Sequence, residues 1–146
     1  MKLLDNMFCV EGQEVRGEDY IFRLRLLPEC PIYQAHFPGT PITPGVCLIQ
    51  LIEELLGLVV EEKLRLVRVK NVKFLQVLVP QAGAEVTCKI GYQEASKRAS
   101  ALVEDAEKTY AKMVLDYYYD YDNDTLRYDD DNDDDNDTLR YENDKR

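Results

Sequence analysis

The only histidine of the 146-residue chain, His36, lies in a stretch that is unusually rich in proline and glycine. An imidazole can accept a proton near neutral pH, so a rigidly held histidine can serve as a general base. Rigidity is predicted here because three prolines within residues 36–44 fix φ and lack the amide donor that a sheet needs. These are Pro38, Pro41 and Pro44. The sequence therefore predicts a stiff, irregular loop around His36.

An apolar helix is expected to follow this loop directly, from about Pro44 to Glu62. Thr43 is predicted to cap the helix, and Pro44 suits its first position, where a missing N–H costs nothing. The amides of Gly45 and Val46 then point out of the first turn, at the positive end of the helix dipole. Such amides form a niche for an oxygen that gains negative charge during a reaction. The pattern indicates a base beside an oxyanion site.

The predicted helix is apolar around most of its circumference, which is typical of a helix wrapped by other elements in a core. One stripe, about a third of the circumference wide, differs from the rest. It contains Val46, Cys47, Gln50, Glu53, Glu54, Gly57 and Glu61. The stripe is either the solvated face of the helix or the lining of a cleft that is reached from the helix start.

Alternating apolar residues and turn signals on both sides of the helix predict strands. The expected strands are Met7–Val15, Tyr20–Leu27, Leu66–Phe74 with a continuation to Val79, Glu85–Tyr92, Ser100–Glu104 and Thr109–Leu115. A long apolar helix between a hairpin and further strands indicates an α+β fold, with an antiparallel sheet curled round a central helix. We expect one domain, from residue 1 to about residue 115.

The negative charge of the chain is concentrated at its C-terminal end. Residues 116–146 contain 13 acidic and 4 basic residues, whereas residues 1–115 contain 15 and 14. The sequence Asp-Asn-Asp-Thr-Leu-Arg-Tyr occurs twice, at 122–128 and 135–141. This composition cannot build a core, so residues 116–146 are predicted to be a disordered tail whose removal leaves the fold unchanged. The aspartate spacing makes calcium binding conceivable, but the glycine of an EF-hand loop is absent.

The cysteines, the basic residues and the apolar run of the helix argue against several classes of protein. Cys9, Cys30, Cys47 and Cys88 are scattered, which predicts reduced thiols, a cytoplasmic location and no metal site. The near-neutral body offers no basic face for nucleic acid. Polar residues interrupt the apolar run of the helix, so no membrane segment is expected. Cys47 is interpreted as a small apolar residue, because no second histidine could activate it as a nucleophile.

The stretch His36-Phe37-Pro38-Gly39-x-Pro41-x-x-Pro44-Gly45-Val46 closely resembles the signature of the 3-hydroxyacyl-[acyl-carrier-protein] dehydratases, which have the hotdog fold. The resemblance covers about residues 3–115. It implies that His36 removes the C2 proton of a 3-hydroxyacyl thioester while the amides of Gly45 and Val46 stabilise the thioester oxygen. It also implies that Phe37 and Gly39 contact the substrate.

The chain departs from the family pattern at one position. In the family, a carboxyl group fourteen residues after the histidine protonates the departing hydroxyl, but this position is Gln50 here. Glu54 lies one turn later, where the family commonly has a glutamine. Either Glu54 is the acid and Gln50 orients the substrate, or a displacement of ~5.4 Å is too long for proton transfer. In the second case the protein would be a weak enzyme, an acyl-chain binder or one half of a mixed dimer.

The resemblance implies dehydration of (3R)-hydroxyacyl-[acyl-carrier-protein] to the trans-2-enoyl form, in fatty acid or related acyl-chain synthesis. We expect a homodimer that needs no metal or organic cofactor. The alternatives are a catalytically impaired acyl-binding or heterodimer-partner subunit, and an acyl thioesterase on the same fold. A group of basic residues could dock the acidic acyl carrier protein and its phosphopantetheine arm. These are Lys63, Arg65, Arg68, Lys70 and Lys73.

Overall fold

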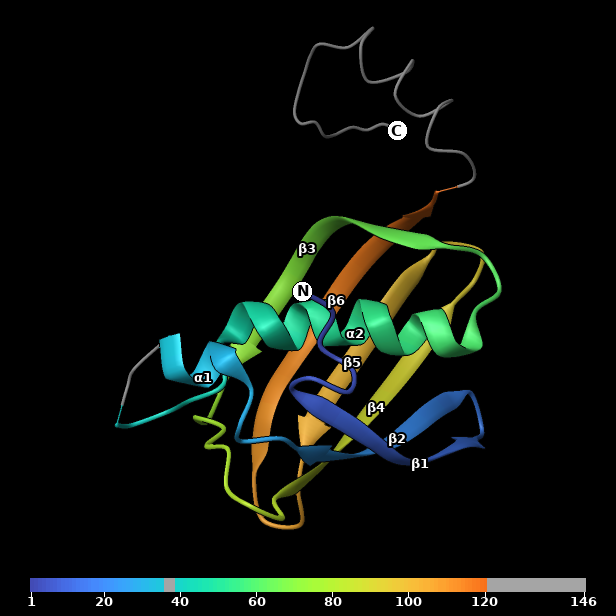
Figure 1. Ribbon diagram of the computed structural model, residues 1–146. Coiled ribbons are helices and arrows are strands. Elements are labelled where there is room, and N and C mark those ends of the chain that lie inside the picture. Colours follow the sequence, from blue (N-terminus) through green and yellow to red (C-terminus); the bar gives the residue numbers. More distant parts are fainter. Residues whose placement is uncertain (36–38, 121–146) are drawn as a thin grey trace, which may run out of the picture.

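The structure is a computed structural model, and it describes residues 1–35 and 39–120. Six strands and two helices make up this part of the chain (Figure 1). In chain order they are β1 Phe8–Arg16, β2 Asp19–Leu26, α1 Pro31–Ala35, α2 Gly45–Val59, β3 Leu64–Phe74, β4 Glu85–Gln93, β5 Arg98–Glu104 and β6 Thr109–Tyr119.

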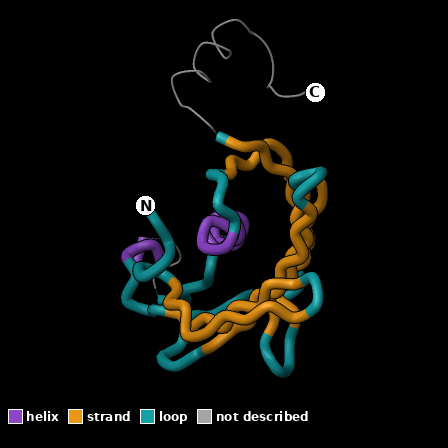
Figure 2. Tube along the Cα trace, turned by 90° about the vertical axis from the view of Figure 1, so that its right-hand side faces the viewer, coloured by secondary structure: helices purple, strands orange, loops and turns teal. Residues whose placement is uncertain are grey.

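The six strands form one sheet in the order β1-β2-β4-β5-β6-β3, and every neighbouring pair is antiparallel. Figure 2 looks along α2 and shows the sheet curling around this helix. The predicted α+β plan, an antiparallel sheet around a central helix, is therefore confirmed. The two edge strands are β1 and β3, so the hairpin β1–β2, which precedes α2, and the strand β3, which follows α2, lie at opposite ends of the sheet.

The core lies between α2 and the concave face of the sheet. On α2, Leu51, Ile52, Leu55 and Leu56 are completely buried. Burial of each such side chain contributes about 1.5–3 kcal/mol to stability. The sheet contributes every second residue of its central strands, including Phe22, Leu24, Cys88, Ile90, Ala99, Val103, Ala111 and Leu115. The apolar helix of the sequence is thus the centre of the fold.

The start of α2 differs from the prediction. Pro44, not Thr43, is the N-cap residue, with an extended backbone and no side-chain cap. The Thr43 hydroxyl is instead buried and hydrogen-bonded to the hydroxyl of Tyr33 at 3.0 Å. Tyr33 belongs to the short helix α1, which the sequence did not predict. The competing partner on α1 explains why Thr43 does not cap α2.

The segment after β3 also differs from the prediction. We expected the strand to continue to Val79, but β3 ends at Phe74. The amide of Leu75 donates to Tyr110 at 2.8 Å, and the carbonyl of Leu78 accepts the amide of Thr43 at 2.8 Å. The segment after Phe74 therefore contacts β6 and the residues before α2 through individual backbone hydrogen bonds. Its β-rich composition alone does not distinguish such a segment from a strand.

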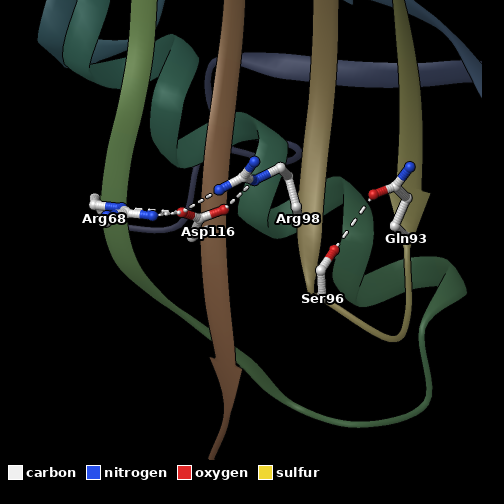
Figure 3. A network of polar contacts seen from close by, with 5 residues as sticks. All are labelled: Arg68, Gln93, Ser96, Arg98 and Asp116. Atoms are coloured by element: carbon white, nitrogen blue, oxygen red, sulfur yellow. Dashed lines mark hydrogen bonds and ion pairs between the residues drawn. The ribbon is translucent and has the colours of Figure 1, made fainter. Parts of the chain in front are cut away.

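At the C-terminal end, β6 continues to Tyr119, so the expected boundary at residue 115 lies inside a strand. Asp116 is buried and accepts hydrogen bonds from Arg68 and Arg98, on the side of the sheet away from α2 (Figure 3). Burial alone would raise the pKa of Asp116, but the two guanidinium groups outweigh burial and lower it. Residues 121–146, with both sequence repeats, lie outside the described residues.

Candidate active site at the start of α2

The predicted base lies outside the described residues. His36, Phe37 and Pro38 separate α1, which ends at Ala35, from Gly39. Gly39 is exposed and has a φ of 85°, which glycine adopts without strain. The catalytic role of His36 and the substrate contacts of Phe37 and Gly39 therefore stay predictions. The structure describes the residues on either side, Ala35 and Gly39.

The helix start that follows this loop leaves two backbone donors open. The first amide of α2 with a backbone acceptor is that of Cys47, which donates to Pro44 at 3.0 Å. Within residues 1–35 and 39–120, the amides of Gly45 and Val46 have no acceptor. The Val46 side chain is 71% exposed, so the first turn reaches the surface. Two amides at a helix N-terminus can stabilise an oxygen that becomes negatively charged.

Sequence reasoning missed the side chain that covers this helix start. A Cβ atom added to Gly45 would lie 2.6 Å from Cζ of Phe74, so no larger residue fits without moving that ring. Phe74 ends β3 and is half exposed. Its ring forms an apolar wall beside the Gly45 amide. The signal that could have revealed the wall is the glycine itself, at a helical position where glycine costs stability.

Further along α2, the structure brings Gln50 and Glu54 together, as expected from their spacing of four residues. Gln50 Nε2 donates to Glu54 Oε2 at 2.7 Å and to the carbonyl of Met1 at 2.7 Å. The Glu54 carboxylate also accepts the Leu3 amide at 2.8 and 3.0 Å and the Leu4 amide at 2.9 Å. Both carboxylate oxygens are therefore engaged by the N-terminal residues of the chain, which sequence reasoning did not include in the site.

The rest of the polar stripe on α2 has mixed surroundings. Glu53 accepts the Leu66 amide of β3 at 3.1 Å. Cys47 is buried, and burial together with the nearby Cys30 raises the pKa of its thiol. A thiol with a raised pKa is a poor nucleophile, in agreement with the apolar role predicted for Cys47. Gln50 and Gly57 are exposed. The stripe is thus not wholly solvated.

The five predicted docking residues lie on or next to β3, an edge strand of the sheet. Two of them are engaged within the chain. Arg65 pairs with Asp120 at 3.1 Å and Arg68 with Asp116 at 2.8 Å. Lys63, Lys70 and Lys73 have no carboxylate within 4.0 Å in the described part of the chain.

The described residues contain no group of three or more side chains suited to hold a metal ion. Their helices are also too short or too polar to cross a lipid bilayer.

Comparisons with known proteins agree with this architecture. The family model of the ApeI-like dehydratases, described as ApeI dehydratase, matches residues 12–114. The dehydratase heterocomplex ApeI:P from Xenorhabdus doucetiae is similar in structure, with 21% identity and a TM-score of 0.66 over 75% of this chain and 96% of that chain. An uncharacterized protein from Erwinia carotovora subsp. atroseptica has 17% identity and a TM-score of 0.60, over 78% and 96%. The expected hotdog fold is confirmed.

Proposed function

The chain belongs to the ApeI-like dehydratase family, and on this basis we propose that it converts (3R)-hydroxyacyl groups on acyl carrier protein to the trans-2-enoyl form. The observation that carries the proposal is the pair of amides, Gly45 and Val46, that have no acceptor among residues 1–35 and 39–120 and directly follow the loop that contains His36. A C2 proton is acidic only if the neighbouring thioester oxygen is stabilised as it gains charge. The helix start can bind that oxygen while the imidazole takes the proton.

In this mechanism His36 removes the C2 proton, and the electron pair of the broken C–H bond forms the C2–C3 double bond. The C3–O bond breaks on the neighbouring carbon, its electron pair stays with the oxygen, and the departing hydroxyl takes up a proton and leaves as water. Gly45 and Val46 hold the thioester oxygen throughout, and the Phe74 ring excludes water from one side. Side chains can carry out both proton transfers, so we propose that no metal or organic cofactor takes part.

The proton donor is proposed to be Glu54, with Gln50 orienting it. In the described structure its carboxylate accepts the amides of Leu3 and Leu4, and a carboxyl group that donates a proton must first release at least one of them. Only the N-terminal residues need to move for this release. Gln50 can keep its contact with Glu54, because the two residues are one helical turn apart.

A second candidate function is favoured by the same contacts. If the Glu54 carboxylate stays bound to the N-terminal amides, the chain supplies a base and an oxyanion site but no acid. It would then act as one subunit of a mixed dimer whose partner carries the acid, and one of the similar structures is named a heterocomplex. Thioester hydrolysis, the third possibility, would need a carboxylate with a free lone pair to activate water.

The proposed assembly is a homodimer that receives acyl carrier protein. The edge strand β3 supports both parts of this proposal. It pairs only with β6 and exposes apolar Val69 and Phe74 beside basic Lys70 and Lys73. An apolar strand edge suits a second protomer, and the lysines suit an acidic carrier protein.

The test is the enoyl absorbance that appears when the purified protein is given a 3-hydroxyacyl thioester. We expect His36→Ala to lower the rate about 10²–10⁴-fold. Glu54→Gln should lower it to a similar extent if Glu54 is the acid. An unchanged rate for this variant, with a large gain for Gln50→Glu, would favour the impaired or mixed-dimer subunit. Release of free thiol without enoyl product would contradict the dehydratase proposal.

A further inference from the structure

The convex face of the sheet, away from α2, carries its charges in rows. One row consists of Gln93, Arg98, Asp116 and Arg68, which are successive partners across β4, β5, β6 and β3. Its guanidinium groups are satisfied by Asp116, as Figure 3 shows. Arg68, Arg98 and Asp116 thus form a network within the chain, while Gln93 accepts a hydrogen bond from Ser96 at 3.4 Å.

A second row lies four or five residues further along the strands, and its positive charges are compensated less completely. Lys89 of β4 pairs with Leu102 of β5, Leu102 with Lys112 of β6, and Lys112 with Lys73 of β3. We call Lys73, Lys89 and Lys112 the lysine row. Like charges directly opposite each other on neighbouring strands destabilise a sheet, and Lys73 and Lys112 are such a pair.

The acidic groups near the lysine row are few. In the described part of the chain, Lys89 alone of the three has a carboxylate within 4.0 Å, that of Glu104 at 3.8 Å. The lysine row borders a groove of about 410 Å³ that also contains Leu102, Val114 and Asp19. Asp19 is the single carboxylate of the groove, against three ammonium groups. An apolar floor with an excess of positive charge suits a negatively charged polypeptide.

We propose that the lysine row binds the aspartate-rich segment 129–137 of the same chain. This segment contains seven aspartates among nine residues and no basic residue. Its charge is therefore complementary to the uncompensated lysines, and its attachment to β6 keeps its local concentration high. The proposal does not rest on the dehydratase reaction, although Lys73 also belongs to the surface proposed to dock the carrier protein.

The length of chain is sufficient for this contact. Lys112 precedes Asp120 by eight residues, which on a strand corresponds to about 26 Å. Asp129 follows Asp120 by nine residues, which can span about 30 Å when extended. The first aspartates of the segment can thus reach the lysine row, and the later ones have length to spare.

The arginines nearer to the end of β6 should attract the segment less than the lysine row does, because their charges are already paired. Arg65 already pairs with Asp120, and Arg68 and Arg98 share Asp116. Lys63 is the nearest control, because its carbonyl accepts the amide of Asp120 at 2.7 Å. If attachment alone decided which lysine meets the aspartates, Lys63 would be met more often than Lys112.

The test is zero-length cross-linking of carboxylates to lysines with a carbodiimide, on the full chain at low ionic strength, followed by mass spectrometry. We expect cross-links from residues 129–137 to Lys73, Lys89 and Lys112 to exceed those to Lys63 and Lys70 several-fold. They should fall sharply at about 1 M salt, where the Debye length is ~3 Å. Equal or greater yields at Lys63 would overturn the proposal.

Dilution and paired lysine variants sharpen the test. Yields that fall on dilution would assign the contact to a second copy of the chain and overturn binding within one chain. The variant Lys73→Gln/Lys112→Gln should lose the remaining cross-links at Lys89, whereas the matched variant Lys63→Gln/Lys70→Gln should keep the pattern. Thermal unfolding verifies that both variants are folded.

Discussion

The start and the middle of α2 present opposite hydrogen-bonding situations on one helix. At the start, the amides of Gly45 and Val46 are donors without an acceptor among the described residues. In the middle, Glu54 is an acceptor whose two oxygens are already engaged by Leu3, Leu4 and Gln50. Glu53 beside it holds the amide of Leu66.

This difference shows which part of the helix can receive a substrate. An incoming carbonyl oxygen needs donors, and the helix start offers two. An incoming hydroxyl would have to compete with the backbone of the chain itself for Glu54. Backbone amides that lose a buried acceptor cost about 1–3 kcal/mol. The oxyanion half of the proposed site is therefore open, while the acid half stabilises the fold.

In the open region, Gly45→Ala is expected to lower both stability and rate. The new methyl group would overlap the Phe74 ring and displace either the ring or the helix start. We expect a stability loss of about 1–3 kcal/mol from overpacking. A displaced oxyanion donor should lower the dehydration rate by up to about 10²–10³-fold.

Denaturant unfolding and the enoyl assay measure the two effects of Gly45→Ala separately. The double variant Gly45→Ala/Phe74→Ala is the control, because it removes the ring that the methyl group would meet. It should recover most of the rate if the overlap is the cause. A Gly45→Ala protein with unchanged stability and rate would show that the contact with Phe74 is irrelevant.

In the middle of the helix, Glu54→Gln is expected to lower stability to a similar extent. The glutamine side chain would place an N–H group among the donors that now point at the carboxylate. We expect a stability loss of about 1–3 kcal/mol, measured by thermal or denaturant unfolding. Glu53→Gln is the matched variant, and its loss should be smaller because one amide oxygen can still accept the Leu66 amide. Equal losses would contradict the distinction between the two glutamates.

The smallest effect concerns Tyr33, which contacts the approach to α2 through Thr43. Burial raises the pKa of Tyr33 to about 12, and the hydrogen bond to Thr43 only partly offsets this. Because this pKa exceeds the usual 10, the contribution of Tyr33 to stability is complete below pH 10 and declines as the pH rises towards 12.

Thr43→Val should raise the pKa of Tyr33 further, because the hydrogen bond that lowers it is lost. The same change should cost about 0.5–1.5 kcal/mol at neutral pH. The tyrosinate absorbance, as the difference from the Tyr33→Phe protein, measures the titration. An unchanged midpoint would indicate that Thr43 has another role, such as the cap that the sequence predicted.

The sequence predicted the order of the elements and the buried helix, because alternation and apolar periodicity are local signals. It did not predict the capping of α2, since Thr43 is a good cap by type but has a partner on α1. The contacts of Glu54 with Leu3 and Leu4 were also missed. They join residues about fifty positions apart, and their donors are backbone amides, which carry no sequence signature.

Asp116 was assigned to the tail because its charge resembles that of the residues after it. The structure places it in β6, where Arg68 and Arg98 compensate its burial. We consequently expect a chain that ends at residue 115 to lose this network, contrary to the prediction from composition. The buried tyrosine that follows, Tyr117, carried the strand signal that the charge obscured.

The alternation of β6 has a consequence for how the chain is assembled. Met113, Leu115 and Tyr117 point into the core, whereas Val114 and Asp116 point outward between them. A slip of β6 by one residue would bury the carboxylate of Asp116 without its guanidinium partners and expose the apolar side chains. We therefore expect the outward Asp116 to favour the observed register of β6, because a shifted pairing would carry the electrostatic cost of a buried, unpaired carboxylate.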